Sequence, residues 1–395
     1  MNDTPAPPPP ARPLRVLIVE DSPEDTQLLL FDLEQSGYRV DSRRVDSAET
    51  LRHALAGPSW DIVLSDHNMP DFSSTEALAL VRERDPDLPF IIVSGSIGEE
   101  QAVAAMRAGA RDYILKGNAR RLIPAIEREL REAADRRERR KAELSLLAQQ
   151  EQLRIAREIQ QRLFPVGPPV LRGWTLAGSS RPADSTGGDY YDYIPMTDGS
   201  LLVVVGDVSG HGLGPALLMA ETRECIRALA LTSADLGEML QRAALLLRPD
   251  FGYDSFMTLL LCQVHPGAGR LTWVNAGHPS GYVLGADGRV KHELKSSAAA
   301  IGLSMEFTPP RPCSLLLQAD DLALLFTDGL LEAFGESGEE FGEQRILDVA
   351  RARRRDPARH LVEALFASVA DFITTSAQQD DITAVVLRRE KEDGP

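Results

Sequence analysis

The chain has 395 residues, with 43 Lys or Arg and 59 Asp or Glu side chains, and its formal net charge is −16. This length predicts about two or three domains, and the acidic balance argues against a protein that coats nucleic acid, whose phosphates would repel it. No apolar run approaches the roughly 20 residues of a membrane helix, and the N-terminus lacks the pattern of a signal peptide. The three cysteines are far apart and have no metal-ligand spacing, so we expect reduced thiols and a cytoplasmic protein without a membrane partner.

Residues 1–13 are rich in proline, which indicates a disordered tail. From Leu14 the pattern alternates between short apolar runs and helical segments, and this predicts a doubly wound α/β domain with a parallel sheet between helices. The predicted strands are residues 14–19, 61–65, 90–93 and 112–115. The predicted helices are residues 24–36, 48–56, 74–84 and 99–108.

Charged and hydroxyl side chains follow each of these predicted strands. Glu20 and Asp21 come after the first, Asp66 after the second, Ser94 after the third and Lys116 after the fourth. The carboxyl ends of parallel strands meet at one edge of a sheet, where ligands bind. Carboxylates can hold a divalent cation there, while a hydroxyl and an ammonium group can contact phosphate oxygens. The sequence therefore predicts a site for a cation and a phosphoryl group.

These residues resemble a two-component receiver domain, and the resemblance covers residues 14–128. It implies that Glu20, Asp21 and Asp66 bind Mg²⁺, and that Asp66 accepts a phosphoryl group from a sensor histidine kinase. The alternative is a receiver that folds but is not phosphorylated.

The resemblance also implies a set of switch residues, namely Ser94, Tyr113 and Lys116. Gly117 stands where a proline usually follows the lysine of receivers. This departure puts the local shape of the loop in doubt, but not the chemistry.

Residues 120–165 have the composition of a helix, which we expect Pro165 to end, and residues 129–165 of it form a linker after the first domain. Arg and Glu side chains alternate closely, as on a solvated helix. Apolar residues nevertheless fit a heptad, at Leu130, Ala134, Leu144 and Ala148. Two interpretations stay open: a solvated spacer helix, or a parallel coiled coil that would make the protein a homodimer.

The last part of this segment is more apolar on one face. Ile155, Ile159 and Leu163 share that face and are followed by Phe164. Such a face usually packs against a neighbouring domain, so we expect these side chains to be buried.

Residues 166–391 contain many short apolar runs and Gly-rich turns, followed by a few long helices, which predicts a sheet-rich α+β domain. The predicted strands are residues 174–178, 190–194, 201–205, 256–264, 271–275, 281–284, 314–317, 322–327 and 382–387. The predicted helices are residues 214–232, 236–247, 343–352 and 358–375.

Four aspartates lie at the edges of predicted strands in this part of the chain: Asp189, Asp207, Asp328 and Asp380. Carboxylates are hard oxygen ligands, which suit Mg²⁺ or Mn²⁺ rather than zinc. Several carboxylates without basic partners would repel one another unless more than one cation were present. A two-metal site can clamp a phosphate and activate a water for in-line attack. The sequence therefore predicts direct hydrolysis of a phosphate ester.

This half resembles the SpoIIE-like bacterial branch of the PPM superfamily of Ser/Thr protein phosphatases. Seven pieces appear in family order between residues 156 and 388: AREIQQRLFP, GGDYYDY, VVGDVSGHG, NAGH, AAAIGLS, LLFTDGLLEAF and QQDDITAVVL. The resemblance implies a β-sandwich flanked by helices, a binuclear Mn²⁺ or Mg²⁺ centre, and phosphoserine or phosphothreonine substrates. The substrate it implies is a phosphorylated anti-sigma-factor antagonist, a small STAS-type protein.

The resemblance also implies individual roles. Asp207 would bridge both ions, assisted by the backbone carbonyl of Val208, and Asp189 would bind one ion. Two further residues, Asp328 and Asp380, would complete the coordination of the other ion. Asp381, the next residue, is the second choice for the last ligand.

Two other functions stay open on the sequence alone. A phosphatase fold could act as a catalytically silent scaffold that sequesters a signalling partner, although the full set of aspartates argues against this. The piece GGDYYDY is also similar to the GGDEF signature of diguanylate cyclases, but its EF part is missing. His211 and His278 are expected to be structural rather than metal ligands.

Overall fold

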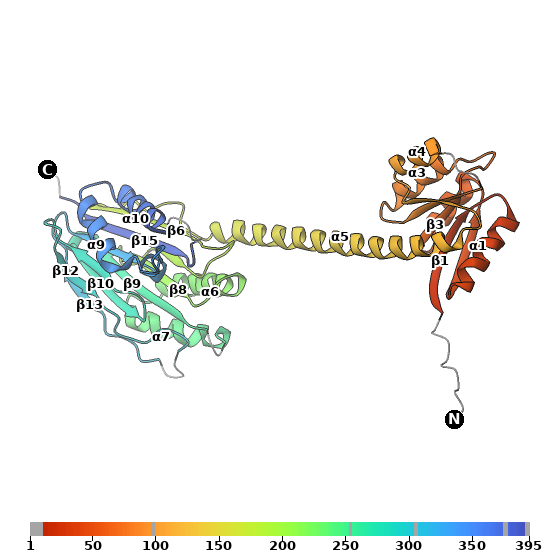
Figure 1. The fold of residues 1–395 in the computed structure, drawn as a ribbon. Helices are drawn as coiled ribbons and strands as arrows, with labels where there is room; N and C mark the ends of the chain where they lie inside the picture. Colours follow the sequence, from red (N-terminus) through yellow and green to blue (C-terminus); the bar gives the residue numbers. More distant parts are fainter. Residues whose placement is uncertain (1–10, 96–98, 253–254, 304–306, 374–377, 392–395) are drawn as a thin grey trace, which may run out of the picture. The chain divides into compact units, whose positions relative to one another are not determined.

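The computed structural model describes residues 11–95, 99–252, 255–303, 307–373 and 378–391 (Figure 1). These residues form two compact units, which divide between Ala148 and Gln149. Strand β1 begins at Arg12, two residues before its predicted start, and most of the predicted tail lies outside the described residues. No helix in the described part of the chain is both long enough and apolar enough to cross a membrane.

The first unit is a parallel sheet in the order β2-β1-β3-β4-β5. Side chains from α2, α3 and α4 share one core with this sheet, while α1 and α5 share the other. The predicted doubly wound α/β domain is therefore confirmed. The elements are β1 (Arg12–Val19), α1 (Pro23–Gln35), β2 (Tyr38–Val45), α2 (Ala48–Leu55), β3 (Ile62–Asp66), α3 (Ser74–Arg84), β4 (Phe90–Ser94), α4 (Glu99–Ala108), β5 (Asp112–Leu115) and α5 (Ala119–Gln161).

Strand β2 was not predicted from the sequence. It is an edge strand that pairs only with β1, and of its eight residues only Tyr38 and Val45 are buried. An edge strand with polar, exposed side chains has no apolar run to mark it.

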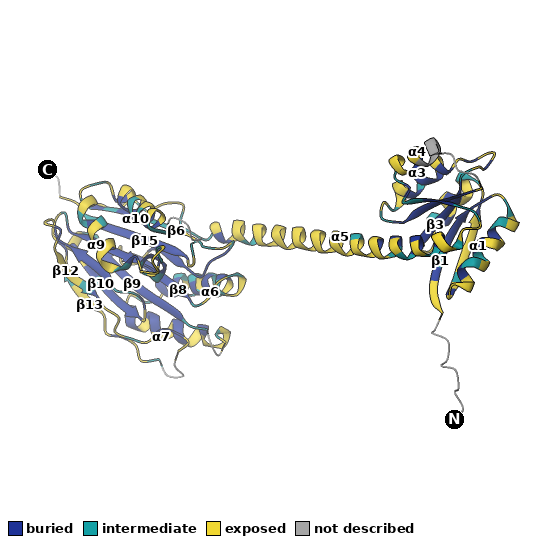
Figure 2. Cartoon of the chain, in the orientation of Figure 1, coloured by how far each residue is buried: buried dark blue, intermediate teal, exposed yellow. Residues whose placement is uncertain are grey.

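Helix α5 has 43 residues, so the last helix of the first unit and the predicted linker form one continuous helix. Its first turns bury Leu122, Ala125 and Ile126 against the sheet. From residue 137 to residue 159 its side chains are almost all exposed (Figure 2). Leu144 of the predicted heptad is 62 % exposed in the single chain.

The second unit is a sandwich of two five-stranded sheets, in the orders β13-β10-β9-β8-β7 and β12-β11-β14-β15-β6. Helices α6 and α7 pack on the outer face of the first sheet, and α9 and α10 pack on the outer face of the second. The inner faces of both sheets share a third core. The sandwich flanked by helices is therefore confirmed. Strand β12 was not predicted, because only the last of its five residues is buried.

The strands of the second unit are β6 (Trp174–Arg181), β7 (Tyr190–Pro195), β8 (Leu201–Val208), β9 (Met257–His265), β10 (Arg270–Ala276), β11 (Gly281–Leu284), β12 (Val290–Leu294), β13 (Cys313–Leu316), β14 (Leu322–Phe326) and β15 (Ile382–Arg389). Its helices are α6 (Leu213–Ala230), α7 (Leu236–Leu247), η1 (Arg248–Asp250), η2 (Pro266–Ala268), α8 (Asp328–Leu331), α9 (Gly342–Arg353) and α10 (Ala358–Ile373).

The alternation of side chains along β8 directs Asp207 toward the space between the sheets. Leu202 and Val204 pack toward the helices, whereas Val203 and Val205 pack toward the other sheet. Because successive side chains point to opposite faces, Asp207 lies on the same side as Val203 and Val205. It therefore lies at the rim of the inner core, where the strand ends.

The apolar face predicted for the end of the linker is only partly correct. Phe164 packs on the sandwich and stacks on the ring of Tyr191, with 5.5 Å between centroids. Ile155 and Ile159 are instead 45 % and 58 % exposed. The helix ends at Gln161 and the chain then turns, so Leu163 and Phe164 leave the helical face on which the sequence pattern placed them.

Candidate functional sites in the two units

Three acids meet at the carboxyl edge of the first sheet. The carboxylates of Glu20, Asp21 and Asp66 offer oxygens that lie within 4.8 Å of one another. Glu20 and Asp66 are buried, whereas Asp21 is exposed. Burial raises the pKa of Glu20, and the neighbouring charge of Asp66 adds to this effect. Three carboxylates this close repel one another when all are ionised, and a divalent cation would relieve that repulsion. Their oxygen atoms are the hard ligands that Mg²⁺ prefers.

Lys116 forms hydrogen bonds to two of these acids, Glu20 and Asp66. Its Nζ donates to Glu20 Oε2 at 2.9 Å and to Asp66 Oδ2 at 3.0 Å. It also donates to Asp25 in the first turn of α1, a contact that the sequence analysis missed. Burial alone would lower the pKa of Lys116, but its hydrogen bonds to three carboxylates outweigh burial and raise the pKa. The lysine is therefore a permanent cation beside Asp66.

The other predicted switch residues lie beside this edge. Ser94 is buried at the end of β4, and the ring of Tyr113 on β5 packs edge-on against His67, the residue after Asp66. Gly117 has a φ of 75°, which proline cannot adopt because its ring fixes φ near −65°. The loop after Lys116 thus takes a shape that a proline at this position would forbid.

In the second unit, Asp189 is the most deeply buried of the four predicted aspartate ligands. It lies directly before β7, and its Oδ2 accepts hydrogen bonds from Thr327 Oγ1 at 2.9 Å and from Thr383 Oγ1 at 2.6 Å. Burial and the nearby charge of Asp207 raise its pKa well above the usual range. The two threonine hydroxyls therefore fix the orientation of the Asp189 carboxylate, but they carry no positive charge that could balance its negative charge.

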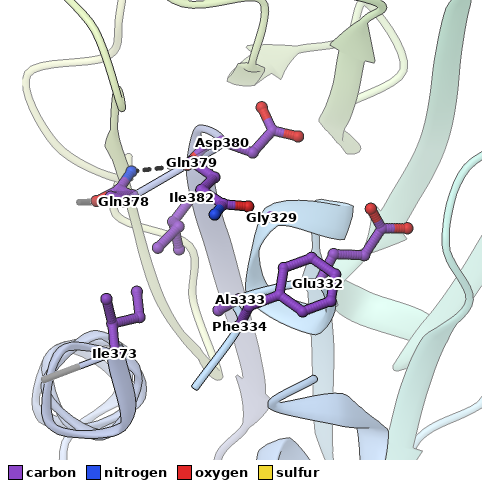
Figure 3. Close-up of a pocket in the computed structure, with 9 residues that line it drawn as sticks. All are labelled: Gly329, Glu332, Ala333, Phe334, Ile373, Gln378, Gln379, Asp380 and Ile382. Atoms are coloured by element: carbon purple, nitrogen blue, oxygen red, sulfur yellow. Dashed lines mark hydrogen bonds between the residues drawn. The ribbon is translucent and has the colours of Figure 1, made fainter. Parts of the chain in front are cut away.

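Three further acids come to the same rim: Asp207 near the end of β8, Asp328 at the start of α8 and Asp380 just before β15. Burial raises the pKa of Asp207 to about 8, and the charges of Asp328 and Asp380 add to the shift. The pKa of Asp328 is raised to about 6 by burial and by Asp380. Asp380 is exposed and lies two residues before β15, and it lines a pocket with Gly329 and Glu332 (Figure 3). The structure thus brings together four acids that are far apart in the sequence.

The carboxylate of Asp381 is buried and binds backbone amides. The residue is 6 % exposed, and its carboxylate accepts hydrogen bonds from the amides of Ala183 at 2.8 Å and Asp189 at 3.4 Å. The adjacent aspartates thus differ: the exposed Asp380 faces the rim, whereas the buried Asp381 holds the segment that carries Asp189.

The four rim acids of the second unit have no cationic partner in the described part of the chain. Within the described ranges, none of the four aspartates forms an ion pair with Lys, Arg or His, so their repulsion has no cation of the protein to offset it. A Cβ atom on Gly188 would lie 2.4 Å from the carbonyl oxygen of Val208 and 3.2 Å from Asp207 Oδ1. Glycine at this position therefore leaves a space in front of two oxygen donors.

The two histidines near the motifs do not join this group. His278 is buried, and its Nδ1 pairs with Thr258 Oγ1 at 2.8 Å. Burial lowers its pKa to about 3, so it is neutral and structural. His211 is exposed and lies 3.2 Å from Asp184.

Comparison with known proteins agrees with this geometry. The family model "Response regulator receiver domain" matches residues 16–127, and "Stage II sporulation protein E (SpoIIE)" matches residues 197–390. The chain thus combines a response regulator receiver domain with a SpoIIE-type domain of the PPM phosphatase superfamily.

Three similar proteins share parts of this organisation. Protein IcfG of Synechocystis sp. is 25 % identical over 400 residues, which cover 94 % of this chain and 58 % of IcfG. Phosphoserine phosphatase RsbU of Bacillus subtilis is 24 % identical over 240 residues, covering 60 % of this chain and 70 % of RsbU. The solved SiaA-PP2C domain of Pseudomonas aeruginosa is 28 % identical with a TM-score of 0.54, covering 62 % of this chain and 98 % of that domain. The chain spans little more than half the length of IcfG.

Proposed function

We propose that this protein is a response regulator whose receiver, phosphorylated on Asp66 by a sensor histidine kinase, controls a metal-dependent phosphoserine/phosphothreonine protein phosphatase. The observation that carries the proposal is the convergence of four aspartates without a basic partner at one rim of the sandwich. The likeness to a phosphoserine phosphatase supports it.

Each residue of the rim has a separate role in this proposal. Asp207, which feels the charges of Asp328 and Asp380 and acts on Asp189, would hold two Mn²⁺ or Mg²⁺ ions together with the carbonyl of Val208. Asp189 would hold one ion, and Asp328 and Asp380 would hold the other. When bound, the ions supply an activated water and neutralise the charge of the phosphate. Thr327 and Thr383 fix the direction of the Asp189 carboxylate, because their hydroxyls occupy one of its oxygens.

Asp381 is assigned a structural role in this arrangement. Its burial and two backbone hydrogen bonds engage both oxygens of the carboxylate. Asp380 is exposed, and its Oδ1 accepts a hydrogen bond from the amide of Asp381 at 2.8 Å, which leaves Oδ2 for a cation. Asp380 is therefore the better fourth ligand, as the family pattern implied.

The proposal is tested first by removing the metal. Excess EDTA should abolish hydrolysis of a phosphoserine protein, because the rim acids cannot activate water without cations. Dialysis followed by Mn²⁺ or Mg²⁺ should restore it, and release of inorganic phosphate measures both steps. Full turnover in EDTA would contradict the two-metal site.

The substrate we propose is a phosphorylated anti-sigma-factor antagonist of the STAS type, as the resemblance to SpoIIE-like phosphatases implies. Purified protein with Mn²⁺ should remove phosphate from that antagonist faster than from unrelated phosphoproteins of the same cell. Equal rates on all of them would reject the assignment.

Phosphorylation of the receiver should change phosphatase turnover, and activation is the expected direction. The physical route is α5, which is continuous from Ala119 to Gln161. A coupling of only about 1–3 kcal/mol changes turnover several-fold. Turnover with and without beryllofluoride, a phosphoryl mimic, measures the coupling. Equal turnover would show that the two domains are merely tethered.

A variant lacking four residues near Ala142 tests the route itself. Regulation that survived this deletion unchanged would exclude α5 as the path. The exposed leucines of α5, among them Leu144, Leu147 and Leu153, favour a homodimer paired through this helix. Light scattering of the intact chain measures that oligomeric state.

A further inference from the structure

Gln160 is the buried polar residue in the last turn of α5. It is 7 % exposed, whereas Ile159 before it is 58 % exposed and Gln161 after it is also exposed. A glutamine is rarely buried this far without hydrogen-bond partners. We therefore expect the side chain of Gln160 to have specific hydrogen-bond partners in the sandwich.

Both polar atoms of the Gln160 amide bind one residue, Gly187. Gln160 Nε2 donates to the carbonyl oxygen of Gly187 at 2.6 Å, and the amide nitrogen of Gly187 donates to Gln160 Oε1 at 3.1 Å. To make both bonds, a side chain at position 160 needs one donor and one acceptor at the length of the glutamine side chain. Glutamate lacks the donor, lysine lacks the acceptor, and asparagine is one methylene shorter.

Gly187 is held on its other side by Asp381. A Cβ atom on Gly187 would lie 2.0 Å from Asp381 Oδ2, so no other residue fits without displacing that carboxylate. Asp381 also accepts from the amide of Asp189. The short segment from Gly187 to Asp189 is thus fixed between the end of α5 and the start of β15.

The end of α5 is itself anchored to the sandwich. Arg223 Nε on α6 donates to the carbonyl oxygen of Leu163 at 2.7 Å, and Phe164 stacks on Tyr191, two residues after Asp189. These contacts hold the last turn in place, so the amide of Gln160 meets Gly187 at a fixed position.

We propose that Gln160 is a positioning residue that sets the place of the Asp189 carboxylate from the last turn of α5. Asp189 lies two residues after the glycine that Gln160 binds, and its two threonine partners come from other strands. A shift of Gln160 would move the backbone of Asp189 while Thr327 and Thr383 stay in place. The inference rests on the proposed function, because it gives Asp189 the role of a metal ligand.

The test replaces Gln160 by methionine in the full-length protein. Methionine matches the length and shape of glutamine but lacks the amide. We expect the Mn²⁺ concentration for half-maximal activity to rise about 10- to 100-fold, the usual effect of losing a partner that orients a ligand. Turnover at saturating Mn²⁺ should change much less. The matched control is Gln161→Met at the exposed neighbouring position, which should leave the titration unchanged.

Two measurements do not depend on activity. Direct Mn²⁺ binding, followed by electron paramagnetic resonance of the free ion, should weaken in Gln160→Met and not in Gln161→Met. The receiver site contributes equally in both variants. Hydrogen exchange should be faster at the amide of Gly187 in Gln160→Met alone, because its acceptor has been removed.

An unchanged Mn²⁺ affinity in a folded Gln160→Met protein would overturn the inference while leaving the phosphatase intact. If methionine prevents folding, Gln160→Glu keeps the shape and the acceptor, and the same weakening of Mn²⁺ binding is expected because the donor is lost. Unchanged binding in that variant would overturn the inference equally. Wild-type protein that binds Mn²⁺ at the receiver alone would overturn the inference together with the proposed function.

Discussion

Replacing Asp207 with alanine is expected to lower phosphatase turnover by about a thousand-fold, which corresponds to a loss of roughly 4 kcal/mol of transition-state stabilisation. Asp207 lies at the end of β8, where burial and the charges of Asp328 and Asp380 act on it. In the proposed site it is the one side chain shared by both ions. Its removal therefore disrupts the whole centre rather than one ligand position.

The domain should still fold in this variant. Removal of Asp207 relieves repulsion among acids in the metal-free protein, so the melting temperature without metal should not fall. The matched control is Asp287→Ala in the turn between β11 and β12, where the aspartate is exposed and its ion pair is with Arg289. Rates of phosphate release from a phosphoserine protein compare the three proteins. Wild-type turnover in Asp207→Ala would refute the site, and a wild-type phenotype in cells despite lost turnover would favour the silent scaffold.

Replacing Asp66 with asparagine is expected to abolish phosphoryl uptake by the receiver. Asp66 ends β3, and its Oδ2 lies 3.0 Å from Lys116 Nζ. An asparagine amide is not a carboxylate nucleophile and cannot form the acyl phosphate. Labelled acetyl phosphate with Mg²⁺ measures uptake as acid-stable, hydroxylamine-sensitive label on the intact chain.

Asp71 offers a control in the same loop. It is exposed and follows Asp66 by five residues, so Asp71→Asn should take up label at the wild-type rate. Label that persists on Asp66→Asn would mean that another residue is the acceptor.

The sequence predicted the elements that have apolar runs and missed those without them. Strands β3 and β4 are buried throughout and β1 over its second half, and all three were located within a few residues. Strands β2 and β12 are edge strands whose outward side chains are polar, so no periodic signal marks them. The shared apolar face expected for Ile155, Ile159 and Leu163 is wrong for a different reason. The helix ends at Gln161, so Leu163 and Phe164 pack on the sandwich after a turn, whereas Ile155 and Ile159 stay exposed on the helix.

The same limit applies to the sites. Acids at strand ends can be recognised from local sequence, and the structure brings Asp189, Asp207, Asp328 and Asp380 to one rim. Their supporting residues cannot be recognised in this way. Thr383 contacts Asp189 across 194 residues of chain, and Lys116 contacts Asp25 across 91. Gln160 looks like any polar residue of a solvated helix until its partner Gly187 is known.

The uninterrupted course of α5 makes the number of its residues a functional quantity. Each residue of an α-helix turns the following side chains by about 100° and advances them by about 1.5 Å. Removing four residues therefore rotates Gln160 by a net angle of about 40° relative to the first turns of the helix, whereas removing seven rotates it by only about 20° in the opposite sense. Linker length in this architecture is thus an angular setting as well as a spacing, and changes by whole heptads preserve the phase.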